Sequence, residues 1–119
     1  MKNTIKHISI ADAKDAVIYL VRIKKIIYVK GDGNSARFFI RDKRNPQGYY
    51  VLTASKNLGY YADILLANKL ERIHQSYIVN RKYVAEEAEG RILKLRIPEG
   101  HEVLVSENNH ATFKAGYLK

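Results

Sequence analysis

The chain has 119 residues, of which 46% are hydrophobic and none is cysteine, and its formal net charge is +9. This length and hydrophobic content fit a single compact domain of residues 1–119. The lack of cysteine excludes a disulfide framework, a cysteine-ligated zinc site and thiol catalysis. No apolar run could cross a bilayer and the first residues lack a secretory pattern, so we expect a soluble cytoplasmic protein.

Short runs of β-branched and aromatic residues follow one another along most of the chain. They predict strands at 4–10, 16–22, 26–30, 35–41, 49–53, 77–79, 91–97 and 102–105. Glycine, asparagine and proline gather between them, and we expect tight turns at 31–34, 45–48 and 98–101. Since parallel strands need long crossovers, these short turns indicate antiparallel sheets.

Two segments have the apolar spacing of short amphipathic helices. The first is predicted at residues 56–68, with Ser55 as its N-cap. The second is predicted at residues 110–118, with Asn108 or Asn109 as its cap. The expected architecture is a mainly β domain of small antiparallel sheets with one or two short helices packed against them.

Positive charge is concentrated in one stretch of the sequence. Eight basic residues and two aspartates lie between Arg22 and Arg44, so this stretch holds +6 of the total +9. Nucleic acid is the leading partner for such a surface, because neutralising phosphates releases counterions and supplies most non-specific affinity. The alternative is a basic surface that only faces solvent. Glu86, Glu87 and Glu89 gather elsewhere, and we expect them to form a solvated acidic turn.

No catalytic or metal-binding pattern is specific enough to support an enzyme. The four histidines are widely spaced, and none has the paired helical spacing of a zinc site. The glycines at 31–33 are followed by a predicted strand rather than a helix, so we interpret this segment as a hairpin turn and not as a phosphate loop. We therefore expect no enzyme activity, no cofactor and no metal.

The most specific feature is the run Arg72-Ile73-His74-Gln75-Ser76-Tyr77-Ile78-Val79-Asn80. It resembles the signature of the LytTR-type DNA-binding domain, an output domain of bacterial response regulators. The aliphatic run and Gly-Asn turn at 26–34, the amphipathic segment 55–66 and the segment 103–106 are similar to elements that flank this signature in the family. The resemblance covers about residues 23–118 and leaves 1–22 as N-terminal strands.

The resemblance implies a fold of three small sheets with short helices, and a transcription regulator that binds double-stranded promoter DNA. Members of the family place loops into two successive major grooves and often bend the duplex. A separate sensor or receiver, or one in a longer chain, is the expected protein partner. Repeated DNA sites read by a dimer or by tandem copies are also expected, and a membrane partner is not.

The resemblance carries three loops and their flanking residues over to DNA contact. Ser35 takes the contact position of the first loop, Gln75 that of the second and Asn108 that of the third. Asn80, Arg81 and Lys82 look suited to the DNA backbone. The expected DNA-binding residues are Ser35, Arg37, Lys43, Arg44, His74, Gln75, Ser76, Asn80, Arg81, Lys82, Asn108 and Asn109.

These residue types suit the task. An Asn or Gln amide offers a donor and an acceptor to the edge of adenine, and Arg does the same for guanine acceptors. Lysine, serine and backbone amides suit phosphates. The third loop departs from the family pattern, because segment 105–110 lacks its usual arginines and contains Glu107.

Other roles stay open for several of these residues. His74 either contacts DNA or lies partly buried and holds its loop, and Asn80 either contacts phosphate or caps a turn. Asn108 and Asn109 serve equally well as helix caps. For the whole chain, the altered third loop favours a protein-interaction module as the alternative function. The nine tyrosines raise a third reading, a binder of single-stranded nucleic acid.

Overall fold

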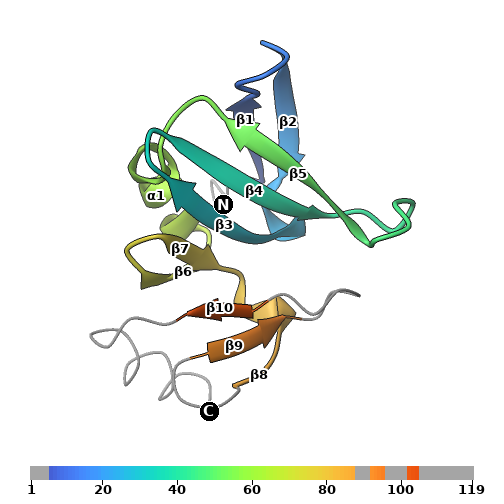
Figure 1. The fold of residues 1–119 in the computed structure, drawn as a ribbon, viewed down its shortest axis with the longest axis vertical. Coiled ribbons are helices and arrows are strands. Elements are labelled where there is room, and N and C mark those ends of the chain that lie inside the picture. Colours follow the sequence, from blue (N-terminus) through green and yellow to red (C-terminus); the bar gives the residue numbers. More distant parts are fainter. Residues whose placement is uncertain (1–5, 88–91, 96–101, 105–119) are drawn as a thin grey trace, which may run out of the picture.

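The computed structural model describes residues 6–87, 92–95 and 102–104, and their strands form three antiparallel sheets (Figure 1). A two-stranded hairpin comes first, followed by a central five-stranded sheet with the order β5-β4-β3-β7-β6 and a three-stranded sheet with the order β10-β9-β8. This confirms the predicted mainly β fold of small antiparallel sheets.

The elements have the following bounds. The hairpin consists of β1 (His7–Ala11) and β2 (Ile18–Arg22). The central sheet consists of β3 (Ile26–Asp32), β4 (Ser35–Arg41), β5 (Tyr49–Ala54), β6 (Glu71–His74) and β7 (Tyr77–Val79). The third sheet consists of β8 (Val84–Glu87), β9 (Ile92–Leu95) and β10 (Glu102–Leu104). One α-helix, α1 (Leu58–Ala67), and two 3₁₀ turns, η1 (Ile23–Lys25) and η2 (Arg81–Tyr83), complete the secondary structure of the described residues.

Each face of the central sheet has its own apolar cluster, because successive strand residues point to opposite faces. Val29 and Phe38 pack on the first face with α1 and the β1–β2 hairpin. Tyr28 and Phe39 stack on the second face with a centroid distance of 4.2 Å, against side chains from η2, β8 and β9. Both faces are therefore largely occupied by packing, and the ends of the sheet are left for contact with a partner.

The structure corrects the predicted limits of α1. The helix begins at Leu58 instead of residue 56, and its N-cap is Asn57, not Ser55. Asn57 Oδ1 accepts a hydrogen bond from the Tyr60 backbone N–H at 3.0 Å, and the Asn57 backbone carbonyl accepts from the same N–H at 3.1 Å. Either polar residue suits a cap by type, and the backbone entering from β5 selects the second.

The helix ends in a Schellman motif. The Leu70 N–H donates to Leu65 O at 3.1 Å and the Lys69 N–H donates to Leu66 O at 3.2 Å. Lys69 takes the left-handed position of this motif, with a φ of 71°. Leu65 and Leu70 are both buried in the first core cluster, which is the apolar contact that accompanies such an end.

Three further predictions differ from the structure. Glu86 and Glu87 lie in strand β8, where they are in register with Lys94 and Leu93, and not in an acidic turn. Strand β6 was not predicted at all. The strand predicted at 16–22 begins at Ile18, because Ala16 has a φ of 57° in the turn before β2. In this turn the Asp12 carboxylate accepts the backbone N–H groups of Lys14 and Asp15. The predicted turn at 98–101 and helix at 110–118 lie outside the described residues.

Candidate nucleic-acid interface

Two of the three expected DNA loops meet at one end of the central sheet. β3 pairs with both β4 and β7, so the β3–β4 turn and the β6–β7 turn emerge side by side (Figure 1). The Gly31 N–H donates to Ser76 O at 2.7 Å and joins the two turns directly. We call this surface the loop edge and define it as residues 32–35 together with 74–76.

Gly31 has a steric reason to be glycine at this junction. A Cβ placed on Gly31 would lie 3.2 Å from the Leu58 Cβ and 3.3 Å from its Cδ2. Leu58 is the first residue of α1 and is buried. The first turn, the second turn and the start of α1 are therefore packed at one point, which fixes the position of the loop edge against the core.

The first turn is shaped by Gly33 and Ser35. Gly33 has a φ of 63°, a conformation that glycine adopts without strain. The Ser35 Oγ donates to Asp32 O at 3.1 Å, so the hydroxyl proton is used inside the turn and its lone pairs stay available as acceptors. Arg37 lies two residues further along β4, is exposed, and is in register with Lys30 of β3. Like charges opposite one another on a sheet repel, and a bound anion would relieve this repulsion.

The second turn is held by Arg72, a residue that was not among the expected site residues. The Arg72 guanidinium donates to Gln75 O at 2.6 Å and to His74 O at 3.4 Å. His74 is partly buried, and its Nδ1 accepts the Ser76 N–H at 3.0 Å. The Gln75 side chain is left exposed at the tip. Arg72 belongs to the family run, which marks it in the sequence. Its role in holding the loop carbonyls is evident only from the structure.

Asn80, Arg81 and Lys82 lie at the other end of the sheet. The Asn80 amide donates to Ile26 O at 3.1 Å, and its Oδ1 accepts the Lys82 N–H at 3.2 Å. It thus caps η2, which is one of the two roles expected for it. Arg81 forms a two-pronged ion pair with Glu71, in which each guanidinium and carboxylate is about one-third exposed or less. Lys82 is exposed.

Lys43 and Arg44 are also remote from the loop edge. They lie in the β4–β5 connection, and β4 runs away from the first turn toward it (Figure 1). Seven strand residues at about 3.3 Å each place this connection roughly 20 Å from Ser35. Both residues are exposed, and Arg44 lies 3.7 Å from the Asp42 carboxylate. Asn108 and Asn109 lie outside the described residues.

Tyr28 lies buried on the second face of the central sheet. Burial raises the pKa of its hydroxyl well above the ordinary value, so this group stays protonated even in strongly alkaline solution. In the part of the chain that the structure describes, no group of histidines and acids could hold a metal ion. None of its helices is long and apolar enough to cross a membrane.

Comparison with known proteins places these features in a family. Residues 16–117 match the sequence model of the LytTr DNA-binding domain. Among solved structures, the fold is similar to a chain described as the LytTr DNA-binding domain of a putative methyl-accepting/DNA response regulator from Bacillus cereus, with a TM-score of 0.66 and 17% identity over 96% of this chain and 97% of that one. No curated protein matches the chain. The chain belongs to the LytTR family of DNA-binding domains.

Proposed function

We propose that this domain is a sequence-specific transcription regulator that reads double-stranded DNA with the loop edge. One observation carries the proposal: the Gly31–Ser76 hydrogen bond brings two turns, far apart in sequence, to a single exposed end of the sheet. A major groove about 12 Å wide admits an element as wide as a two-stranded ribbon, so a hairpin turn of the loop edge fits it. The same end carries Lys30 and Arg37 for the flanking phosphates.

Gln75 is the residue proposed to read a base. Its side chain is exposed at the tip, while its backbone carbonyl is held by Arg72. The side-chain amide therefore extends from a fixed backbone position, and it offers a donor and an acceptor to adenine. Ser35, His74 and Ser76 lie beside it, and we propose that they contact phosphates or base edges from the same surface.

Four further expected residues are proposed to act away from this groove. Lys43 and Arg44 would contact phosphates farther along the duplex, because their hairpin lies at the opposite end of the sheet. Asn108 and Asn109 would enter the next major groove with the third loop. Contact with two grooves from one side favours a bent duplex, and paired sites favour a dimer or tandem copies. A receiver or sensor is the proposed source of the input signal.

The competing single-strand reading has little support from the tyrosines. Tyr28, Tyr49, Tyr61 and Tyr83 are all buried at 6% exposure or less and serve the core. Tyr60 is exposed, but Lys56 lies over its ring at 5.6 Å. Stacking of successive bases needs several exposed rings along one groove. Double-stranded DNA is therefore the better supported partner.

Protein interaction is supported as a second role by strand β2. Ile18 and Leu20 are 71% and 69% exposed on this strand, which pairs only with β1 among the described strands. An exposed apolar edge of this kind suits pairing with another protein. Replacing both residues with aspartate should reduce self-association in sedimentation experiments. The affinity for an isolated half-site should stay within about twofold, since substitutions at exposed positions outside the loop edge change little there.

The decisive experiment is selection of binding sites from random duplexes at physiological salt. A sequence-specific reader should enrich one motif, and paired use should show as a repeat at about one helical turn. The Gln75→Ala variant, selected in parallel, should lose preference at a single position of that motif. Binding without an enriched motif would contradict sequence-specific recognition.

A further inference from the structure

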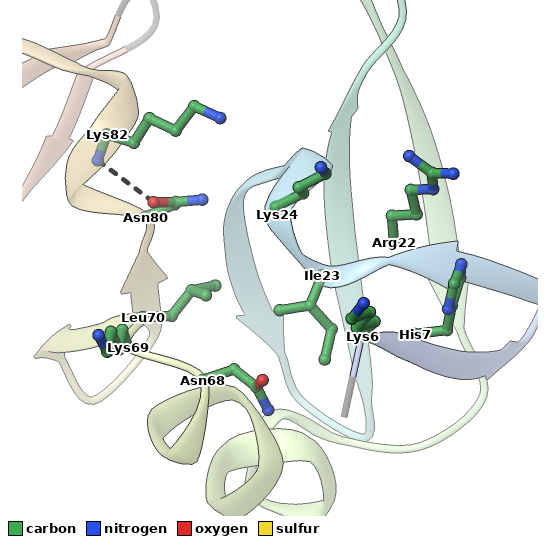
Figure 2. Close-up of a pocket in the computed structure, with 10 residues that line it drawn as sticks. All are labelled: Lys6, His7, Arg22, Ile23, Lys24, Asn68, Lys69, Leu70, Asn80 and Lys82. Carbon is green, nitrogen blue, oxygen red and sulfur yellow. Dashed lines mark hydrogen bonds between the residues drawn. The ribbon is translucent and has the colours of Figure 1, made fainter. Parts of the chain in front are cut away.

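A cavity of about 460 Å³ lies at the end of the central sheet opposite the loop edge. One wall comes from β1, β2 and η1, and the facing wall comes from the end of α1 and from η2 (Figure 2). Five cationic side chains line it from both walls, and they are Lys6, Arg22, Lys24, Lys69 and Lys82. All five are exposed. None of them belongs to the loop edge.

Among the residues that the structure describes, no carboxylate lines this cavity. Within the described ranges, the ion pairs are Arg44 with Asp42 and Arg81 with Glu71, and neither uses a cation of the cavity. Glu71 follows directly on the cavity wall at Leu70, but its carboxylate is taken by Arg81. Five like charges around one cavity repel one another, and an anion with several charges would remove this cost.

The floor of the cavity is apolar. Ile23 and Leu70 line it and are 3% and 4% exposed, so they belong to the first core cluster. The two amides of the wall are used within the fold: Asn68 Nδ2 donates to Ile64 O at 2.8 Å, and Asn80 bonds Ile26 and Lys82. An occupant therefore meets an apolar floor under a rim of cations.

The end of α1 does not oppose an anion here, although a helix C-terminus carries partial negative charge. The Schellman bonds occupy the Leu65 and Leu66 carbonyls, and Asn68 occupies that of Ile64. The last free acceptors of the helix are thereby largely satisfied inside the protein. The cationic side chains then dominate the field in the cavity.

Lys69 is the most informative member of the cluster. Its φ of 71° lies in the left-handed region, at the helix position where glycine is the least strained residue. Lysine is thus found where the backbone favours a residue with no side chain, and the side chain that it adds lines the cavity. Backbone strain of this kind persists where a function depends on it.

We propose that this cavity binds a small organic anion with two or more negative charges beside an apolar or aromatic group, of which a nucleoside diphosphate is the representative. The phosphates would meet Lys24, Lys69 and Lys82 at the rim, and the organic part would cover Ile23 and Leu70. The volume falls within the roughly 300–1,000 Å³ of small-molecule sites. The site is separate from the loop edge, and it does not depend on base reading there.

The test is isothermal titration of the 119-residue chain with ADP, pyrophosphate and adenosine at about 50 mM salt, where charge interactions are weakly screened. ADP should bind saturably, and both adenosine and pyrophosphate should bind about tenfold more weakly or worse, because each lacks one half of the match. Saturable binding that is equally strong for pyrophosphate would overturn the organic half of the proposal. No saturable binding of ADP would overturn all of it.

Lys69→Gly is the most discriminating variant, because it removes the cation and relieves the backbone strain together. It should raise the dissociation constant for ADP about tenfold while raising the melting temperature, so weaker binding cannot be due to unfolding. Lys56→Ala is the matched control, since Lys56 is exposed but does not line the cavity. If Lys69→Gly binds ADP as the wild type does, the site is wrong.

DNA phosphate is the other source of the same chemistry, and a second measurement separates the two. Lys24→Ala and Lys69→Gly should leave the salt dependence of duplex binding unchanged if the cavity takes a small ligand. If these variants lower the log–log salt slope by about 0.9 each while ADP fails to bind, the cations contact the DNA backbone and the proposal is overturned.

Discussion

The start of α1 is capped by one amide side chain. Asn57 Oδ1 accepts the Tyr60 N–H, which also donates to the Asn57 backbone carbonyl, and replacement by alanine removes the side-chain acceptor. Asn57→Ala should lower the free energy of unfolding by about 1 kcal/mol, measured by urea denaturation. Ser55→Ala is the matched control, because Ser55 is an exposed polar residue two positions earlier that does not cap the helix. Equal losses for both variants would contradict this assignment.

A substitution at Gln75 tests whether this single residue reads a base. An amide gains little from a phosphate but matches adenine with two hydrogen bonds, which discriminate by about 1–3 kcal/mol. Gln75→Ala should weaken the best site about tenfold and leave non-specific affinity nearly intact, measured by fluorescence anisotropy on both duplexes. Since Gln75 is exposed, its loss should leave the melting temperature unchanged. Full retention of base preference would show that the second loop docks elsewhere.

At the scale of elements, the β6–β7 turn is ordered by Arg72 from within its own strand pair. The guanidinium donates to two successive carbonyls, so its removal frees the tip that carries Gln75. Arg72→Ala should increase amide hydrogen exchange at residues 74–76 and weaken the best DNA site. Arg72→Ala combined with Gln75→Ala should cost less than the sum of the two single changes, because both act on one contact. Strict additivity would indicate that Arg72 binds DNA independently.

Sequence patterning predicted the elements whose own residues determine their secondary structure. β3, β4, β5 and β7 are rich in β-branched and aromatic residues and end at turn residues, so local chemistry and tertiary pairing agree. β6 and β8 contain charged residues such as Glu71, Glu86 and Glu87, and they are strands because a neighbour pairs with them. Composition alone carries no information about that neighbour.

Sequence patterning likewise predicted one part of the candidate site and missed another. Residues of the two turns were identified from the family resemblance, but their meeting depends on the pairing of β3 with β7, which no local pattern encodes. For the same reason the capping role of Asn80 was left open beside a phosphate contact, and the carbonyl contacts of Arg72 were missed. The basic cavity gathers residues from segments 6–7, 22–24, 68–70 and 80–82, which are far apart in the sequence, and its cations look like ordinary surface charges there.

At the scale of the whole molecule, the two ends of the central sheet allow a test of how far bound DNA extends along the domain. The Lys43–Arg44 hairpin lies roughly 20 Å from the loop edge, so it would contact phosphates outside the base-read segment. Replacing both residues with alanine should reduce the log–log salt slope by about one to two, nearly equally on all sequences. Duplex titrations over a range of salt concentrations provide the measurement, and an unchanged slope would place this hairpin away from DNA.

Bending is the second property of the whole molecule. A protein that enters two grooves from one side gains contacts when the duplex curves, at a cost of about 1–6 kcal/mol that varies with sequence. Circular permutation of the selected site should therefore give gel mobilities that depend on its position in the fragment. Uniform mobility at every position would show that the duplex stays straight.

The packing of β1 bears on how this domain could be joined to other proteins. The family match starts at residue 16, within the turn before β2, yet Ile8 and Ile10 of β1 are buried in the core. The Ser55 N–H donates to Ala11 O and the Ala13 N–H donates to Thr53 O, and these two bonds also tie this strand to the end of β5. A fusion joined at residue 16 would leave β2 without its partner, as an open edge that bears Ile18 and Leu20, and such edges aggregate. The practical junction for a chimeric regulator therefore lies ahead of His7, outside the limits that family similarity alone would suggest.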